Sequence, residues 1–216
     1  MKTCYLLLFL LVSFAVIAQE KDEEILDVDF EANKLNSEGY ELMMAGQYEA
    51  AKKLFWQAIN IDPDVFFFYE NLANACEETN DQQGMLACYA KAKVHLPDEP
   101  NIFYFSGDVL QNNGRLEEAI NDYTNAVKLA EKKGSQLLYL FYFNRGNSWL
   151  KLKNYQKAVR DYDEAIKLQP FHQPSFVNRG MSRYNLKDKE GACQDWQKGV
   201  KLGYEQAENY LNKFCK

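Results

Sequence analysis

The strongest constraint on the fold of this chain is a pair of small-residue series that recur with the same spacing. The first series is Gly39, Ala73, Gly107, Gly146 and Gly180, whose sequence positions differ by 34, 34, 39 and 34 in turn. The same intervals separate the members of the second series, Ala58, Ala92, Ala126, Ala165 and Gly199. Because both series share one longer interval, they mark a single repeated unit. A unit of this length built from two amphipathic helices is typical of a helical solenoid.

The first unit shows which physical requirement each position meets. Small residues such as Gly39 and Ala58 are expected where two helices cross, because a branched side chain there would push the backbones apart. Large residues such as Leu42 and Phe55 recur at helical spacing and fill the space between the helices. Pro63 ends the second helix, since proline lacks an N–H group and disfavours helix in the residue before it. Each unit is therefore predicted to be a helical hairpin.

The units carry the residue pattern of a known repeat family. The fourth unit shows it in Tyr142, Gly146, Trp149, Tyr155, Ala158, Tyr162, Ala165 and Pro170. The second and fifth units depart from the pattern, since Ala73 replaces a glycine and Gly199 replaces an alanine. Over residues 32–202 the chain resembles the tetratricopeptide repeat (TPR) family. This resemblance implies an all-α fold, a right-handed solenoid of five αα-hairpins plus a C-terminal capping helix.

The register of the repeats sets the expected boundaries. The five units are expected at residues 32–65, 66–99, 100–138, 139–172 and 173–203. A capping helix within residues 204–216 would cover the open end, as solenoids require. The longer third interval is expected to lengthen a helix or a loop near residues 130–138. Residues 19–31 hold seven acids and are expected to form a mostly solvated lead-in.

Residues 1–18 have the pattern of a secretory signal peptide. Lys2 supplies the positive charge, and Tyr5–Ile17 is a short, mostly apolar stretch. Val16 and Ala18 suit a cleavage site before the next residue. A membrane anchor is the alternative, but this apolar stretch is shorter than the roughly 20 residues that a spanning helix needs. We therefore expect an exported protein without a membrane span after cleavage. The periplasm is the expected location, with secretion or outer-membrane association as the alternatives.

Export would place four remaining cysteines where disulfides form. Cys193 and Cys215 each lie about eleven residues from a turn near residues 203–204, so they should be level across a helical hairpin. A Cys193–Cys215 disulfide is predicted, and two buried free thiols are the alternative. Cys76 and Cys88 are also nearly level across a turn, and their pairing stays open.

The sequence offers no constellation for catalysis. We find no Gly-rich phosphate loop and no nucleophile with a matched base. No cysteine pair has the spacing of metal ligands, and the only histidines are His95 and His172. Asp122, Asp161 and Asp195 precede aromatic residues at the repeat spacing, and we interpret them as solvated neighbours of core rings. The chain is therefore expected not to be an enzyme and to need no cofactor or metal.

Charge and aromatic content narrow the class of partner. With 31 acidic and 25 basic residues, the net charge of −6 argues against nucleic acid or an anionic membrane as the main partner. The chain holds 14 Tyr and 14 Phe, more than the repeat's own packing positions use. The surplus lies in the first helices of repeats two to four, at residues 66–69, 103–105 and 139–143.

The TPR resemblance implies that six positions on the first helix of each unit line a concave groove. The candidate groove residues are Phe67, Asn71, Asn74, Tyr104, Phe143, Asn144, Asn147, Asn178 and Tyr184. Asparagines at a shared position could pair with the backbone of an extended peptide, or could be a common feature of the family. The aromatic residues could form a contact surface or belong to the core. The same positions in repeat two also hold Glu70, Glu77 and Glu78.

These features predict a non-catalytic interaction module. It resembles exported bacterial scaffolding and assembly proteins, and is expected to bind a peptide or protein segment in the groove. The alternative is a structural adaptor that uses the convex face or the solenoid end, or that self-associates. TPR domains that clamp the terminal carboxylate of heat-shock chaperones use Lys and Arg in the groove. Here Lys151 is nearly alone, so that activity is not expected.

Overall fold

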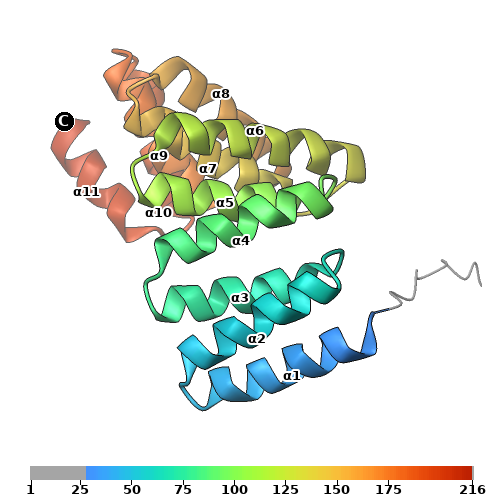
Figure 1. Cartoon of the computed structure of the whole chain (residues 1–216). Coiled ribbons are helices and arrows are strands. Elements are labelled where there is room, and N and C mark those ends of the chain that lie inside the picture. Colours follow the sequence, from blue (N-terminus) through green and yellow to red (C-terminus); the bar gives the residue numbers. More distant parts are fainter. Residues whose placement is uncertain (1–27, 216) are drawn as a thin grey trace, which may run out of the picture.

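The computed structural model describes residues 28–215, which form eleven α-helices and no strand. The helices are α1 (Phe30–Met44), α2 (Tyr48–Ile61), α3 (Phe66–Glu78), α4 (Gln82–His95), α5 (Pro100–Asn112), α6 (Leu116–Lys133), α7 (Leu138–Lys151), α8 (Tyr155–Leu168), α9 (Gln173–Asn185), α10 (Lys189–Lys201) and α11 (Glu205–Phe214). Consecutive helices pack against each other, and Figure 1 shows the pairs stacked from α1 toward α10, with α11 against the last pair. The predicted all-α solenoid of hairpins with a closing helix is confirmed.

Small residues are required where the helices of one hairpin cross. A Cβ atom on Gly146 would lie 2.9 Å from Cε1 of Tyr162, and one on Gly180 would lie 2.6 Å from Nε1 of Trp196. Both rings are fully buried and come from the second helix of the same unit. The backbone of the first helix therefore rests directly on an aromatic ring of the second, and a methyl group in between would force them apart.

The turn inside each hairpin has one residue with positive φ. The five residues are at equivalent places in the five units, Gly46, Asn80, Gly114, Lys153 and Lys187. Only glycine adopts this conformation without strain, so Lys153 (φ 59°) and Lys187 (φ 71°) are held there at a cost.

Helix capping follows the identity of that turn residue. Where it is not glycine, the next residue caps the second helix: side chains of Asp81, Asn154 and Asp188 accept a backbone N–H bond. Where it is glycine, the next residue is Gln47 or Arg115, and its side chain makes no capping bond. Each turn thus has either an unstrained glycine or a side-chain cap.

The longer third interval is taken up mainly by α6. This helix has 18 residues, whereas α8 has 14. It ends at Gly134, which has φ 67° and closes the helix in the left-handed conformation. The sequence predicted a longer helix or a longer loop near this point, and the structure has the longer helix.

The ends of the solenoid differ. Helix α11 covers the last hairpin, where Trp196 and Val177 are buried against Ala207 and the half-buried rings of Tyr210 and Phe214. At the other end α1 starts at Phe30, so the last two residues of the predicted acidic lead-in are helical. The rest of the lead-in and the predicted signal peptide lie outside the described residues, except residues 28 and 29. Within the described range, every helix is too short or too polar to cross a membrane.

Candidate binding groove

The first helices of the hairpins form one face of the solenoid. Helix α1 contacts α3, α5 contacts α7, and α7 contacts α9, whereas no two second helices pack comparably within residues 28–215. Closer approach of the first helices is the geometry of a concave inner side. The groove positions are Asn33, Asn36, Ser37, Tyr40, Met43 and Met44 on α1; Phe67, Glu70, Asn71, Asn74, Glu77 and Glu78 on α3; and Asn101, Tyr104, Phe105, Asp108, Gln111 and Asn112 on α5.

Three of the predicted asparagines link neighbouring first helices. Asn71 Nδ2 donates to Asn36 Oδ1 at 2.9 Å, and Asn178 Nδ2 donates to Asn147 Oδ1 at 2.9 Å. Asn144 Nδ2 makes the equivalent bonds from α7 to the Tyr104 hydroxyl and the Asp108 carboxylate on α5. The shared asparagine position is therefore a connection between repeats.

In the C-terminal half of the groove these bonds join into one network. The Asn147 carbonyl oxygen accepts from Asn178 and also from the Tyr162 hydroxyl at 2.8 Å. The Asn147 amide donates to Asn144 Oδ1 at 3.3 Å. The sequence left open whether these amides pair with a peptide or are a common feature of the family; in the structure the donors of Asn144, Asn147 and Asn178 are engaged within the chain. Asn74 is exposed and makes no side-chain hydrogen bond to the described residues.

Of the four predicted groove aromatics, three pack against other rings of the chain and one is exposed. Tyr104 stacks on Phe141 with ring centroids 4.6 Å apart, and Phe143 packs edge-on against His172 at 4.8 Å. Tyr184 packs against Phe214 at 4.6 Å. These three rings are half-buried and support the core. Phe67 alone among the four reaches the exposed class, with 36% of its surface accessible.

The N-terminal half of the groove is hollowed by two pockets that we call the N-terminal groove. One pocket, of about 290 Å³, is lined by Glu70, Asn71, Ala73, Asn74, Glu77, Met85, Tyr89 and Phe105. The other, of about 300 Å³, is lined by Met43, Met44, Tyr48, Asn74, Glu77 and Glu78. Asn74 and Glu77 belong to both, so the pockets are continuous along α3.

The N-terminal groove is strongly acidic. No Lys or Arg lines either pocket, and Glu70, Glu77 and Glu78 form no ion pair with the described residues. Burial, and then the charge of Glu99, raise the pKa of the Glu70 carboxyl above its ordinary value. Farther along the groove, burial raises the pKa of Asp108 although Tyr123, Tyr104 and Asn144 donate hydrogen bonds to it. Glu70, Glu77 and Glu78 are therefore carboxylates without a countercharge among the described residues, whereas Asp108 is held by internal hydrogen bonds.

The aspartates before the core aromatics were expected to be solvated, and that prediction is wrong. Asp122 and Asp161 are each 6% exposed and Asp195 is 3% exposed. Arg145 binds both carboxylate oxygens of Asp161, at 2.8 and 2.7 Å, and Arg179 binds Asp195 in the same way. A buried carboxylate needs such a partner. The signal in the sequence was the arginine that precedes Gly146 and Gly180.

The third repeat makes the same ion pair with different residues. Ser106 stands where Arg145 and Arg179 stand in later repeats, and Lys93 from α4 supplies the cation. Lys93 Nζ lies 2.5 Å from Asp122 and 2.9 Å from Ser106 Oγ, beside a pocket of about 690 Å³. Because the cluster occupies the position of the other ion pairs, we assign it a structural role. The described residues contain no group of side chains suited to hold a metal ion.

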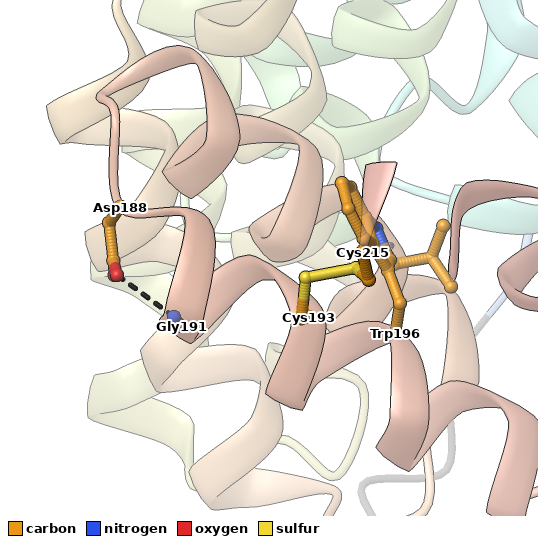
Figure 2. Close-up of a disulfide and its surroundings, with 6 residues drawn as sticks. Asp188, Gly191, Cys193, Trp196 and Cys215 are labelled. Carbon is orange, nitrogen blue, oxygen red and sulfur yellow. Dashed lines mark hydrogen bonds between the residues drawn. A yellow bond between two sulfur atoms is a disulfide. The ribbon is translucent and has the colours of Figure 1, made fainter. Parts of the chain in front are cut away.

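The two C-terminal cysteines lie side by side (Figure 2). The Sγ atoms of Cys193 on α10 and Cys215 after α11 are 2.06 Å apart, and their Cα atoms are 5.8 Å apart. The arrangement permits the predicted disulfide, which would tie the end of α11 to α10 beside the buried Trp196. Cys76 and Cys88 are unpaired and buried, and burial raises the pKa of the Cys76 thiol to about 11.

Two of the repeats match a known repeat family, and the chain has relatives among known proteins. Residues 100–133 and 139–172 each match a family model described as a tetratricopeptide repeat. The chain is 32% identical over 133 residues to the DnaJ homolog subfamily C member 7 homolog of Dictyostelium discoideum, which covers 62% of this chain. It is 28% identical, over 61% of its length, to human tetratricopeptide repeat protein 6. The aligned parts span only 18% and 24% of those relatives.

Solved structures share most of the helical arrangement. The MamA protein superposes with a TM-score of 0.70 and 14% identity, covering 85% of this chain and 95% of that one. YrrB, described as a TPR protein with an unusual peptide-binding site, superposes with a TM-score of 0.69 and 17% identity, covering 84% and 92%. At these identities the likeness establishes the fold. Residues 100–133 and 139–172 are thus tetratricopeptide repeats, and the described chain is built as a TPR solenoid.

Proposed function

We propose that this protein is a non-catalytic scaffold that binds a segment of another protein in its concave groove. TPR solenoids are protein-interaction modules, since stacked repeats create an extended concave surface. The observation that carries the proposal is the N-terminal groove, where the pockets are lined by apolar side chains and by Asn74 and Glu77, whose side chains make no hydrogen bond or ion pair with the described residues. The structurally similar YrrB is described as having a peptide-binding site.

The N-terminal groove is the better candidate within the concave face. In the C-terminal half, the amides that could meet a peptide backbone are engaged within the chain, those of Asn144 and Asn178 by the preceding repeat. In the N-terminal half, Asn74 keeps both its donor and its acceptor for a ligand, and Phe67 is exposed two turns away on α3. A carboxamide of this kind pairs with a peptide backbone whatever the sequence of the peptide.

The test is affinity capture from the native cell with a groove variant. The double variant Phe67→Ala/Asn74→Ala should lose the captured partner. The matched control, Lys128→Ala/Gln197→Ala, changes exposed residues of the second helices α6 and α10 and should retain it. Loss of the partner in the control alone would exclude the groove and favour the convex face.

The proposed place of action is the bacterial cell envelope, most directly the periplasm. The support is the signal-like pattern of residues 1–18, together with a cysteine pair suited to an oxidising compartment. N-terminal sequencing of the protein from its native cells should find a chain that begins at Gln19. A chain that retains Lys2 would contradict export by this signal.

Self-association through the N-terminal end of the solenoid is a second candidate. Helix α1 leaves Phe30, Tyr40 and Met44 with 83%, 48% and 70% of their surfaces exposed. Exposed apolar side chains on a terminal repeat can mark an interface. Sedimentation analysis separates the candidates, because a dimer that forms with rising concentration and is abolished by Phe30→Ser, which lies outside both pockets of the groove, supports self-association.

A further inference from the structure

We infer that the N-terminal groove recognises a cationic protein segment, in which a Lys or Arg side chain is flanked by apolar residues. This inference rests on the proposed function and names the chemistry of the partner. The two pockets of the N-terminal groove are lined by three carboxylates, those of Glu70, Glu77 and Glu78, and by no Lys or Arg. A basic side chain of the partner would supply the missing countercharge.

Other buried carboxylates of the chain have cationic partners, whereas the glutamates of the N-terminal groove have none among the described residues. Asp161 and Asp195 are buried and each is held by an arginine through two hydrogen bonds. Glu70 is half-buried and lies near Glu99, which raises rather than relieves the local negative charge. Because no described cation pairs with Glu70 or Glu77, a bound ammonium or guanidinium group would gain charge-assisted hydrogen bonds without displacing an internal partner.

An aromatic wall completes the pocket at the junction of α3 and α5. Phe105 occupies the position that Asn71, Asn144 and Asn178 hold in other repeats. The asparagine link between first helices is therefore absent at this junction. Instead Phe105 stacks on Tyr89, with ring centroids 6.3 Å apart, and both rings line the pocket beneath Glu70. Aromatic faces beside carboxylates favour a cation with an apolar stem.

The size and shape of the groove favour a protein segment. Each pocket, about 290 and 300 Å³, is at the lower end of the range for small-molecule sites, and the two share Asn74 and Glu77. The second pocket is lined by Met43, Met44 and Tyr48, which suit an apolar side chain. An extended chain can place a basic side chain in the first pocket and an apolar one in the second, with Asn74 facing its backbone.

The experiment measures binding of a short fluorescent peptide in which Lys alternates with Leu, by anisotropy, to the full chain. The variant Glu70→Gln/Glu77→Gln should weaken binding by about tenfold or more, because it removes the charges that contact the lysines. The matched control Glu205→Gln/Glu208→Gln removes the same net charge from exposed positions on α11 and should change binding less than about twofold. Phe105→Asn should also weaken binding, since it removes the aromatic wall.

The binding measurements have outcomes that would overturn the proposed preference for a cationic segment. Thermal melts check that each variant folds. Glu70 and Glu77 make no ion pair with the described residues, so their substitution by Gln should leave the melting temperature close to that of the unchanged chain. If the two glutamine pairs weaken binding equally, the attraction is only general charge and the inference is wrong. If a peptide with Glu in place of Lys binds as well as the Lys peptide, it is also wrong. A partner captured through Phe67 and Asn74 but insensitive to Glu70→Gln/Glu77→Gln would leave the proposed function standing and overturn the cationic specificity alone.

Discussion

At the scale of single residues, the hairpin turns show a balance between backbone strain and helix capping. Lys187 is held at φ 71°, and the next residue, Asp188, accepts a 2.9 Å hydrogen bond from the N–H of Gly191 (Figure 2). Gly46 adopts positive φ without strain, and the residue after it, Gln47, makes no capping bond. The stability of each turn therefore depends on two neighbouring residues, the one with positive φ and the one after it that can cap the second helix.

Removing a cap should cost stability only where the turn residue is not glycine. Asp188→Ala should lower the free energy of unfolding by about 1 kcal/mol, because it leaves the N–H of Gly191 unbonded. The matched substitution Gln47→Ala should change it by less than about 0.5 kcal/mol. Urea unfolding followed by circular dichroism measures both, and equal losses would contradict the compensation.

The buried ion pairs between the hairpin helices should be among the most sensitive sites. Asp161→Ala leaves Arg145 buried without its partner and should destabilise the fold by about 3–5 kcal/mol. Asp98→Ala, at an exposed aspartate in the turn before α5, is the control and should have little effect. A loss at Asp161 no larger than that at Asp98 would show that the pair does not hold the hairpin together.

Asp108 should make the stability depend on pH in a defined direction. Its pKa is raised by burial, so the folded state holds the proton more tightly than the unfolded state. Stability contributed by this group is therefore lost as pH rises from its ordinary pKa through the raised one. Asp108→Asn removes that loss while keeping an acceptor for Tyr123 and Asn144. Melting temperatures near pH 4 and pH 7 should favour the variant more at the higher pH, and an equal difference at both would contradict the assignment.

At the scale of helices, the C-terminal element depends on its side-chain contacts. Helix α11 has 10 residues, which is too short to be stable alone, and it is held by the packing of Tyr210 and Phe214 on Trp196. The predicted Cys193–Cys215 disulfide would add a covalent link at its end. The first helix has no such cover on its outer side within the described residues.

The disulfide should be detectable and should stabilise this cap. Reduction should add two hydrogen atoms to the intact mass, and an unchanged mass would exclude the bond. Cys215→Ser should destabilise the C-terminal end by about 3 kcal/mol in the chain-entropy model, since the loop spans 22 residues. Hydrogen exchange should then rise first in α11, whereas α1 should be unaffected.

The helices could be predicted from sequence more completely than their polar contacts. The spacing from Gly39 to Gly180 determined the register, and with it the five hairpins. The bonds of Asn144 and Asn178 could not be predicted in this way, because their partners lie on the preceding unit and depend on how the two units stack. For the same reason, a pattern confined to one helix led to the wrong prediction that Asp161 is solvated.

At the scale of the whole molecule, the concave face has two halves of different character. From α7 onward the amides and tyrosines of the groove bond to one another and tie the repeats together. From α1 to α5 the groove is open and acidic, and Phe105 lines it at a position where three other repeats hold asparagine. We interpret the first as structural reinforcement and the second as the surface available to a partner.

The most direct test of this account is photocrosslinking in the native cell with a reactive amino acid at position 74, in the N-terminal groove. The same residue at position 197, on the exposed side of α10, is the control. We predict a specific adduct from position 74, identified by mass spectrometry as a basic segment of one protein, and none of that protein from position 197. An adduct with the same protein from position 197 alone would contradict the account, because it would place the interface on the outer face.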